Sequence, residues 1–276
     1  MAIRRPGLLL VGGGKMGSAL LAGWLDRGMP AGDIAVVEPD PIQASCVREH
    51  HGVAVRTTAA EAASDSPPGV VVFAVKPQVM DAIVPAYRDL AGPEVVFLSI
   101  AAGRTIDSFA AMLGERAAIV RAMPNTPAAV RRGITVACPN DRVSDDQVRR
   151  CHDLLEAVGE VAWVDDESLM DAVTAVSGSG PAYVFLLAEC LEAAGKEAGL
   201  PTELAQRLAR ATVSGAGELL ARSPETAAVL RRNVTSPGGT TAAALDVLMS
   251  DGDASLQGLM TRAVAAATRR GKELAG

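Results

Sequence analysis

Short apolar runs alternate with helix-like segments along the first part of the chain. A helical period follows the first run, over Met16–Arg27, and similar intervals separate the later runs. The runs that predict strands are Leu8–Val11, Ile34–Val37, Val70–Val75, Val95–Ile100 and Ala117–Ala122, with further strand signals at Ile134–Cys138 and Glu160–Val164. Runs that are apolar throughout indicate strands buried on both faces, and strands alternating with helices predict a parallel, doubly wound sheet.

The pattern changes after about Asp165, where strand signals stop and helical spacing takes over, as in Leu204, Leu208 and Leu219. Thr202, Ser223 and Asp253 are candidate N-caps of these helices. We therefore predict an α/β protein with two domains. Residues 1–165 form a Rossmann-type domain with a doubly wound parallel sheet, and residues 166–276 form an all-α domain.

Composition narrows the possible partners. The formal net charge of −6 gives no advantage in neutralising phosphates, so we expect no nucleic-acid partner. The four cysteines lack CxxC or zinc-site spacing, which predicts free thiols and no metal. No apolar run has membrane length, and Met1–Pro6 with the short run after it does not make a signal peptide. We therefore expect a cytoplasmic protein with no membrane partner.

A glycine-rich loop follows the first predicted strand. Gly12, Gly14 and Gly17 form GxGxxG between a strand and a helix, which is the context that makes this pattern specific. The glycines permit a tight turn, close approach of the backbone to a pyrophosphate, and close helix packing. The helix N-terminus then offers unpaired N–H groups to phosphates. The loop predicts a dinucleotide site.

Two further positions bear on this site. Glu38 ends the second strand, where an acidic side chain can accept hydrogen bonds from the adenosine ribose, although a solvent-exposed carboxylate is the plain alternative. Lys76 follows the third predicted strand, and it is equally well interpreted as a phosphate-facing cation or as a surface lysine. Ala101 and Ala102 after the fourth predicted strand leave room for a nicotinamide ring.

A second candidate anion site lies far along the chain, in Asn233–Thr241. Pro237 is expected to end one helix, Gly238 and Gly239 free the backbone, and Thr240 and Thr241 are expected to begin the next helix. Backbone N–H groups at such a helix start can bind a small carboxylate. An ordinary turn with threonine caps is the alternative. Ser177–Pro181, which the pattern places between two helical runs, is a second unusual small-residue segment.

Together these segments resemble the Δ1-pyrroline-5-carboxylate reductase family. The resemblance covers nearly the whole chain and is carried most clearly by the Ser-Pro-Gly-Gly-Thr-Thr core of Val234–Leu245. The other matching segments, in order, are Ala74–Pro77, Met123–Pro127, Asp171–Thr174 and Ser177–Pro181. The resemblance implies NAD(P)H-dependent reduction of pyrroline-5-carboxylate to proline. It also implies a homodimer at least, with interlocked C-terminal helices, and rings of dimers.

The resemblance also implies residue roles. Thr241 is the implied catalytic residue, its hydroxyl meeting the ring nitrogen of the substrate. The implied substrate site comprises Glu167, Asn233, Gly239, Thr240 and Thr241. The candidate cofactor site comprises Val11, Gly12, Gly13, Gly14, Lys15, Met16, Gly17, Glu38, Ala74, Val75, Lys76, Pro77, Ile100, Ala101, Ala102 and Asn233.

Cofactor choice is where this chain departs from its family. Many relatives carry a small polar residue at the position of Glu38 and an Asn near Ala59, groups that hold the 2′-phosphate of NADPH. Both are missing here, so NADPH and NADH are both candidates and Glu38 favours NADH. Arg48 or Arg56 could offset the repulsion between Glu38 and a 2′-phosphate.

Two other functions compete with the reductase. A hydroxy-acid dehydrogenase would share the two-domain plan but needs a general base on the helical domain. Lys196 is the only lysine there before Lys272. A non-catalytic dinucleotide sensor would share the glycine-rich loop. The second candidate anion site disfavours the sensor, which has no need of one.

Overall fold

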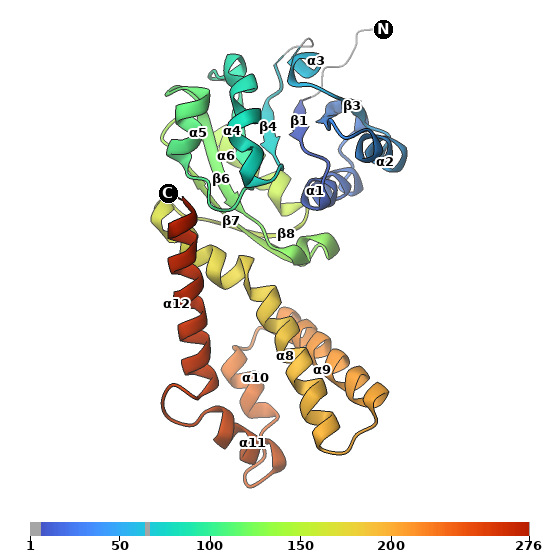
Figure 1. Cartoon of the computed structure of the whole chain (residues 1–276), viewed down its shortest axis with the longest axis vertical. Helices are drawn as coiled ribbons and strands as arrows, with labels where there is room; N and C mark the ends of the chain where they lie inside the picture. Colours follow the sequence, from blue (N-terminus) through green and yellow to red (C-terminus); the bar gives the residue numbers. More distant parts are fainter. Residues whose placement is uncertain (1–6, 64–66, 276) are drawn as a thin grey trace. The chain divides into compact units, whose positions relative to one another are not determined.

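The computed structural model describes residues 7–63 and 67–275, and Figure 1 shows the arrangement of its elements. Residues 1–6, which bear on the expectation of no signal peptide, lie outside the described residues. The chain divides into two compact units. The first runs to Gly178 and also takes in the segment from Thr268 onward, and the second is Ser179–Ala267. Each unit is described here by itself.

The first unit contains a sheet that is eight-stranded over the described residues, in the order β3-β2-β1-β4-β5-β6-β7-β8. The strands are β1 (Leu8–Val11), β2 (Ile34–Val37), β3 (Ala54–Arg56), β4 (Val70–Phe73), β5 (Val96–Ser99), β6 (Ala118–Met123), β7 (Gly133–Pro139) and β8 (Gly159–Trp163). All seven predicted strands are present, and the prediction missed β3.

Helices cover both faces of this sheet. They are α1 (Lys15–Asp26), α2 (Pro41–His51), α3 (Ala59–Ala63), α4 (Met80–Ile83), α5 (Ile106–Leu113), α6 (Asp145–Glu156) and α7 (Met170–Val173). Alternate strand residues enter two separate cores. Leu10 joins a cluster with Trp24 of α1 and Leu155 of α6, whereas Leu9 joins one with Phe109 of α5. The continuous apolar strands therefore have the two-sided burial that the sequence predicted.

One strand pair departs from the predicted parallel arrangement of the sheet. β7 pairs with β6 in antiparallel register, with Arg121 opposite Cys138, while the other neighbouring strands of the described sheet pair in parallel. The physical reason is the short link between these two strands. It contains only the 3-10 turn Thr126–Val130, and a parallel crossover needs a dozen or more residues.

The second unit is helical, and no strand follows β8 within the described residues. Its helices are α8 (Gly180–Glu197), α9 (Thr202–Arg222), α10 (Ala227–Asn233) and α11 (Thr240–Leu248), together with the first part of α12 (Leu256–Ala275). Helices α8 and α9 pack side by side as a hairpin (Figure 1). A π-helical turn, Thr174–Gly178, precedes α8.

The predicted domain boundary between residues 165 and 166 lies inside the first unit. Residues just beyond it belong to the sheet unit because Met170 is fully buried in its second core and Glu167 pairs with Arg121 of β6. The end of α12 returns to this unit as well. The substrate-binding and dimerising roles predicted for residues 166–276 are a separate matter and are treated as proposals below.

The predicted N-caps are wrong in detail. Thr202 is already the first residue of α9. Ser223 follows the end of α9, and α10 is capped instead by Thr226, whose Oγ1 accepts from the Val229 N–H. Near Asp253, the cap is Ser255, whose Oγ accepts from the Gly258 N–H. Several capping residues stand within a few positions of each start, so local sequence does not choose among them.

Candidate active site

The dinucleotide loop has the backbone that its glycines predict. Gly12 follows β1 with a φ of 102°, a region that favours glycine. A Cβ at Gly17 would collide with the carbonyl oxygen of Gly12, so only glycine lets α1 begin so close to the loop. At Gly14 a Cβ would meet nothing within 4 Å, which leaves that side of the loop open to a ligand.

The start of α1 suits an anion. Its N-cap is Gly14, which offers no side chain to the first-turn N–H groups, and no acidic residue lies in the first turn. Gly13 is buried whereas Gly14 and Lys15 are exposed. The N-terminus of α1 therefore presents backbone N–H groups and a partial positive charge to solvent. These groups suit the binding of a pyrophosphate.

Glu38 is held against this loop. It is only 9% exposed, and its carboxylate accepts two backbone bonds, from the Gly13 N–H at 2.8 Å and from the Asp40 N–H at 3.0 Å. The plain alternative of a solvent-exposed strand-end carboxylate is therefore wrong. Each carboxylate oxygen has a further lone pair, so Glu38 can still accept hydrogen bonds from a ribose.

The segments after β4 and β5 lie at the same edge of the sheet as the loop. The Ala74 N–H donates to Val11 O at 2.8 Å, and the Ile100 N–H donates to Phe73 O at 3.2 Å. Lys76 is exposed, Ala101 is buried and Ala102 is exposed. The carboxyl edge of a parallel sheet is where such folds bind ligands. The structure therefore brings the predicted cofactor residues of this unit together.

The sequence reasoning missed Arg104, which fixes the turn after Lys76. Its guanidinium donates to Pro77 O at 3.0 Å and forms an ion pair with Asp81 at 2.6 Å. This guanidinium hydrogen bond is the main cause that lowers the pKa of Asp81 below its ordinary value. No sequence motif marks Arg104, because its partners lie more than twenty residues earlier.

Glu167 also lies in the sheet unit, where it pairs with a buried cation. Its Oε1 accepts from the Arg121 guanidinium at 2.7 Å and from the Ile106 N–H at the start of α5 at 2.8 Å. The Arg121 side chain is only 5% exposed, and Asp171 lies 3.9 Å from its other terminal nitrogen. The sequence reasoning missed Arg121. An arginine inside an apolar strand was the one available signal.

The second predicted loop has the same construction as the first. Gly238 has a φ of 69°, Gly239 is the N-cap of α11, and this helix start also lacks a side-chain cap and an acidic residue. Thr240 and Thr241 are the first two residues of α11, as predicted. The Gly239 N–H itself donates to Ser236 O, so the N–H groups available to a ligand begin at Thr240.

Two details of this loop correct the sequence interpretation. Pro237 does not end the preceding helix, because α10 already ends at Asn233. Asn233 is exposed, and its side-chain Nδ2 donates to Glu225 Oε2 at 3.1 Å, a partner that the sequence reasoning missed. Ser177–Pro181 is not an interhelical turn but part of the continuous helical run into α8.

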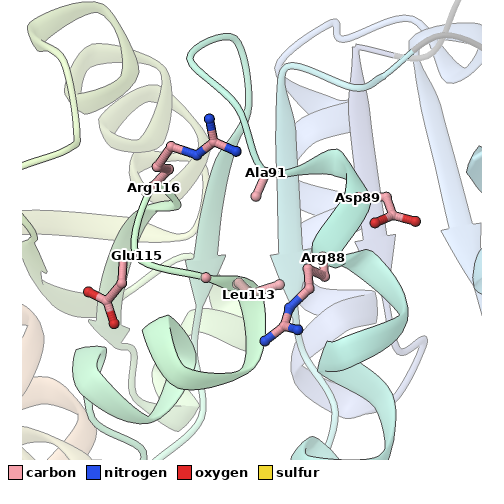
Figure 2. Close-up of a pocket in the computed structure, with 7 residues that line it drawn as sticks. Arg88, Asp89, Ala91, Leu113, Glu115 and Arg116 are labelled. Atoms are coloured by element: carbon pink, nitrogen blue, oxygen red, sulfur yellow. The ribbon is translucent and has the colours of Figure 1, made fainter.

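A shallow hollow of about 430 Å³ lies at the opposite edge of the sheet unit, beside the amino ends of β5 and β6 (Figure 2). Arg88 and Arg116 line it together with Asp89 and Glu115, so its charges balance. Arg88 donates to the carbonyls of Ala111 and Met112, near the end of α5. These bonds give Arg88 a structural role, and ligands of such sheets bind at the other edge.

Curated relatives match the chain over nearly its whole length. A pyrroline-5-carboxylate reductase of Pseudomonas aeruginosa is 41% identical over 270 residues, which are 98% of this chain and 97% of that protein. The chain belongs to the pyrroline-5-carboxylate reductase family. Residues 167–274 match the family model described as pyrroline-5-carboxylate reductase dimerisation. Residues 7–103 match the model described as NADP oxidoreductase, coenzyme F420-dependent.

Solved structures agree with this assignment. A pyrroline-5-carboxylate reductase of Coxiella burnetii has a TM-score of 0.92 at 35% identity, covering 99% of this chain and all of that one. A pyrroline carboxylate reductase of Plasmodium falciparum with NADP bound has a TM-score of 0.81 at 29% identity, covering 98% of both. The predicted family, fold class and enzyme class, an NAD(P)-dependent oxidoreductase with a dimerisation domain, are confirmed.

Two absences concern only the described part of the chain. Within residues 7–63 and 67–275, no three His, Cys, Asp or Glu side chains are grouped so that they could hold a metal ion. Over the same residues, the helices are too short or too polar for any of them to cross a membrane.

Proposed function

We propose that the chain reduces the C=N bond of 1-pyrroline-5-carboxylate to give L-proline, the last step of proline biosynthesis, with NADH or NADPH as hydride donor. The observation that carries this proposal is the pair of helix starts at α1 and α11. Each follows a glycine of positive φ and begins without a side-chain cap. One suits the pyrophosphate of a dinucleotide, and the other suits the carboxylate of a small substrate.

The main contribution of the protein to this reaction is to place the hydride donor and the imine in contact. A bound nicotinamide dinucleotide supplies the hydride, and the protonated imine is already electrophilic. The chain contributes orientation, which brings reacting atoms into contact and removes much of the entropic cost of the encounter. We assign the carboxylate to the N–H groups of Thr240 and Thr241, and the ring nitrogen to the Thr241 hydroxyl.

The remaining family positions have supporting roles in this proposal. We assign Asn233, whose side chain donates to Glu225, to contacts with substrate and cofactor, and Gly239 shapes the turn before α11. Glu167 is fixed in place by its ion pair with Arg121 and contributes to the substrate site. The hydroxy-acid dehydrogenase is disfavoured because Lys196, its candidate base, forms an ion pair with Glu192 at 3.0 Å.

Turnover tests the reaction directly. Purified protein should oxidise NADH or NADPH only when pyrroline-5-carboxylate is added, and folded protein that turns over neither cofactor contradicts the proposal.

Thr241→Val should lower kcat by about 100-fold, the usual loss for one aligned catalytic donor, and leave dinucleotide affinity unchanged. Thr261→Val is the matched control, because the Thr261 hydroxyl bonds Gln257 within α12, donating to its backbone O and accepting from its side-chain Nε2. If Thr241→Val keeps the kcat of the wild type, the Thr241 hydroxyl has only a structural role.

We further propose that NADH is used at least as well as NADPH. Glu38 lies at the end of β2, where the ribose binds in such folds, and it is nearly buried. A carboxylate there repels a 2′-phosphate by ~1–3 kcal/mol, which is about ten- to a hundredfold in affinity. Comparing kcat/KM for both cofactors in wild type and Glu38→Ser tests this. A tenfold wild-type preference for NADPH, or an unchanged ratio in the variant, contradicts it.

The assembly we propose is a homodimer at least, with dimers joined into larger rings. The support is the helical unit, whose apolar side chains on α8 and α9 stay exposed in the single chain. Light scattering of the purified protein tests both the dimer and the ring. The mass of a dimer alone would contradict the ring, and the mass of a monomer would contradict both. We also place the protein in the cytoplasm, since its four cysteines are free thiols.

A further inference from the structure

Two helices of the sheet unit begin with the same kind of sequence. α6 starts Ser144-Asp-Asp-Gln147, and α2 starts Asp40-Pro-Ile-Gln43. At α6 the capping box is complete. The Gln147 N–H donates to Ser144 Oγ at 3.4 Å, and the Ser144 N–H donates to Gln147 Oε1 at 2.9 Å. This reciprocal pair is the usual result of such a sequence.

At α2 only half of the box is present. The Gln43 N–H donates to Asp40 Oδ1 at 2.8 Å, as expected. The Asp40 N–H, however, donates to Glu38 Oε1 at 3.0 Å, so a residue outside the helix takes the place of the Gln43 side chain. Gln43 is thereby released from the local role that Gln147 performs in α6.

The released side chain reaches the dinucleotide loop. Gln43 Nε2 donates to the carbonyl oxygen of Gly13, thirty residues earlier, at 2.5 Å. The same oxygen accepts from Ser18 Oγ of α1 at 2.8 Å, and the Gly13 N–H donates to Glu38 Oε2 at 2.8 Å. Both backbone polar groups of Gly13 are thus bound by the protein, and turning its flanking peptides would break these bonds.

We propose that Gln43 is a positioning residue for the dinucleotide, acting through Gly13 together with Ser18. Gly13 is buried and the next two residues are exposed, so a fixed Gly13 aims the following N–H groups outward before any ligand arrives. Such preorganisation raises affinity by reducing the ordering cost of binding. This inference rests on the proposed function to the extent that the chain must bind a dinucleotide.

The test measures dinucleotide affinity directly, without substrate. The dissociation constant for NADH and for NADPH is measured by fluorescence titration of full-length protein. Gln43→Leu and Ser18→Ala each leave one donor on Gly13 O, so each should raise Kd about three- to tenfold. The double variant leaves a buried carbonyl unpaired and should raise Kd about thirtyfold or more. In turnover assays the KM for dinucleotide should rise while kcat at saturation stays unchanged.

Gln147→Leu is the matched control, because it removes the same side chain from the same position of α6. It should lower the melting temperature and leave Kd unchanged. Ser18→Ala protects the test against misfolding, since alanine favours the helix. The proposal is overturned if Gln43→Leu and Ser18→Ala bind like Gln147→Leu, or if kcat falls as much as affinity. If the wild-type protein binds neither dinucleotide, the proposed function itself is contradicted.

Discussion

The two units of this chain differ sharply in how they bury apolar surface. Leu10, Val36 and Val72 of the central strands are fully buried, and cores form on both faces of the sheet. In the helical unit, among the described residues, only Ala205, Ala209 and Ser255 are buried. Its large apolar side chains remain exposed, including Phe185 at 63% and Leu219 at 56%.

The difference shows which unit is complete in a single chain. Val184, Phe185, Leu186 and Leu187 are consecutive and all exposed, so they surround α8 on every side. A helical segment that is apolar all round is typically buried, as this one turn of α8 would be in an assembly. Small residues in the unit's packed hairpin, such as Ala205 beside Gly195, give the single chain little apolar surface to bury. We infer that a second copy covers this surface, and residues 167–274 match the family's dimerisation model.

A charge placed on α8 is the most severe test of this difference between the two units. Phe185→Asp should raise the dimer dissociation constant by about 100-fold or more, because an unpaired charge would be buried between copies. Light scattering at micromolar concentration gives the mass, and near-ultraviolet circular dichroism reports whether the sheet unit stays folded. Ile42→Asp is the control, because Ile42 is 81% exposed on α2 of the self-sufficient unit. An unchanged mass for Phe185→Asp, or dissociation of the Ile42 control, contradicts the comparison.

A smaller effect separates two glycines of α9. In the single chain a Cβ at Gly215 or Gly217 meets nothing within 4 Å. Gly215 shares a face with the exposed Leu208 and Leu219 by helical spacing, and Gly217 lies on the opposite side. Gly217→Ala should therefore stabilise the protein by about 0.5–1 kcal/mol through helix propensity.

Gly215→Ala should lose that gain, because the added methyl meets the partner copy. Thermal unfolding at matched protein concentration compares the two variants. Equal stabilisation by both would show that the leucine face of α9 stays uncovered in the assembled protein.

The smallest effect concerns the thiols. Burial raises the pKa of Cys138 to about 11 and of Cys151 to about 12, so at pH 7–9 both stay protonated and react slowly with a disulfide reagent. Their reaction should quicken only as the pH approaches these raised values. Cys46 and Cys190 are exposed in the single chain, but Cys190 lies on α8.

We therefore expect one fast thiol, Cys46, in the wild type, and a second in Phe185→Asp. Thiol titration followed by peptide mapping identifies them. Fast reaction of Cys190 in the intact dimer would show that its part of α8 faces solvent.

The sheet was predictable where burial is two-sided and was missed where it is not. β1 and β2 are unbroken apolar runs whose ends match the prediction, because every residue in them is buried. β3 is a three-residue edge strand with exposed or half-exposed side chains, so its sequence carries little apolar signal. The antiparallel β7 depends on the length of a connection, which no strand pattern records.

The residues of the candidate site also differ in how far the sequence predicted them. The glycines of both loops were predictable because backbone geometry is a local requirement, as the positive φ values of Gly12 and Gly238 show. The partners of Arg121 and Gln43 were not predictable, because they lie forty-six and thirty residues away in sequence. The helix starts were wrong where several candidate caps stand together, as at Ser223 and Thr226.

The last helix gives this architecture a consequence for biosynthesis on the ribosome. α12 begins in the helical unit, yet its residues from Thr268 onward belong to the sheet unit. There Gly271 lies so close to Asp171 that a Cβ would sit 3.1 Å from its carboxylate, and Leu274 packs near Gly103. The sheet unit, although almost all of it is synthesised first, cannot complete its packing until the final helix emerges. Its folding is therefore not purely vectorial, and the order of synthesis ties completion of the nucleotide-binding unit to that of the helical unit.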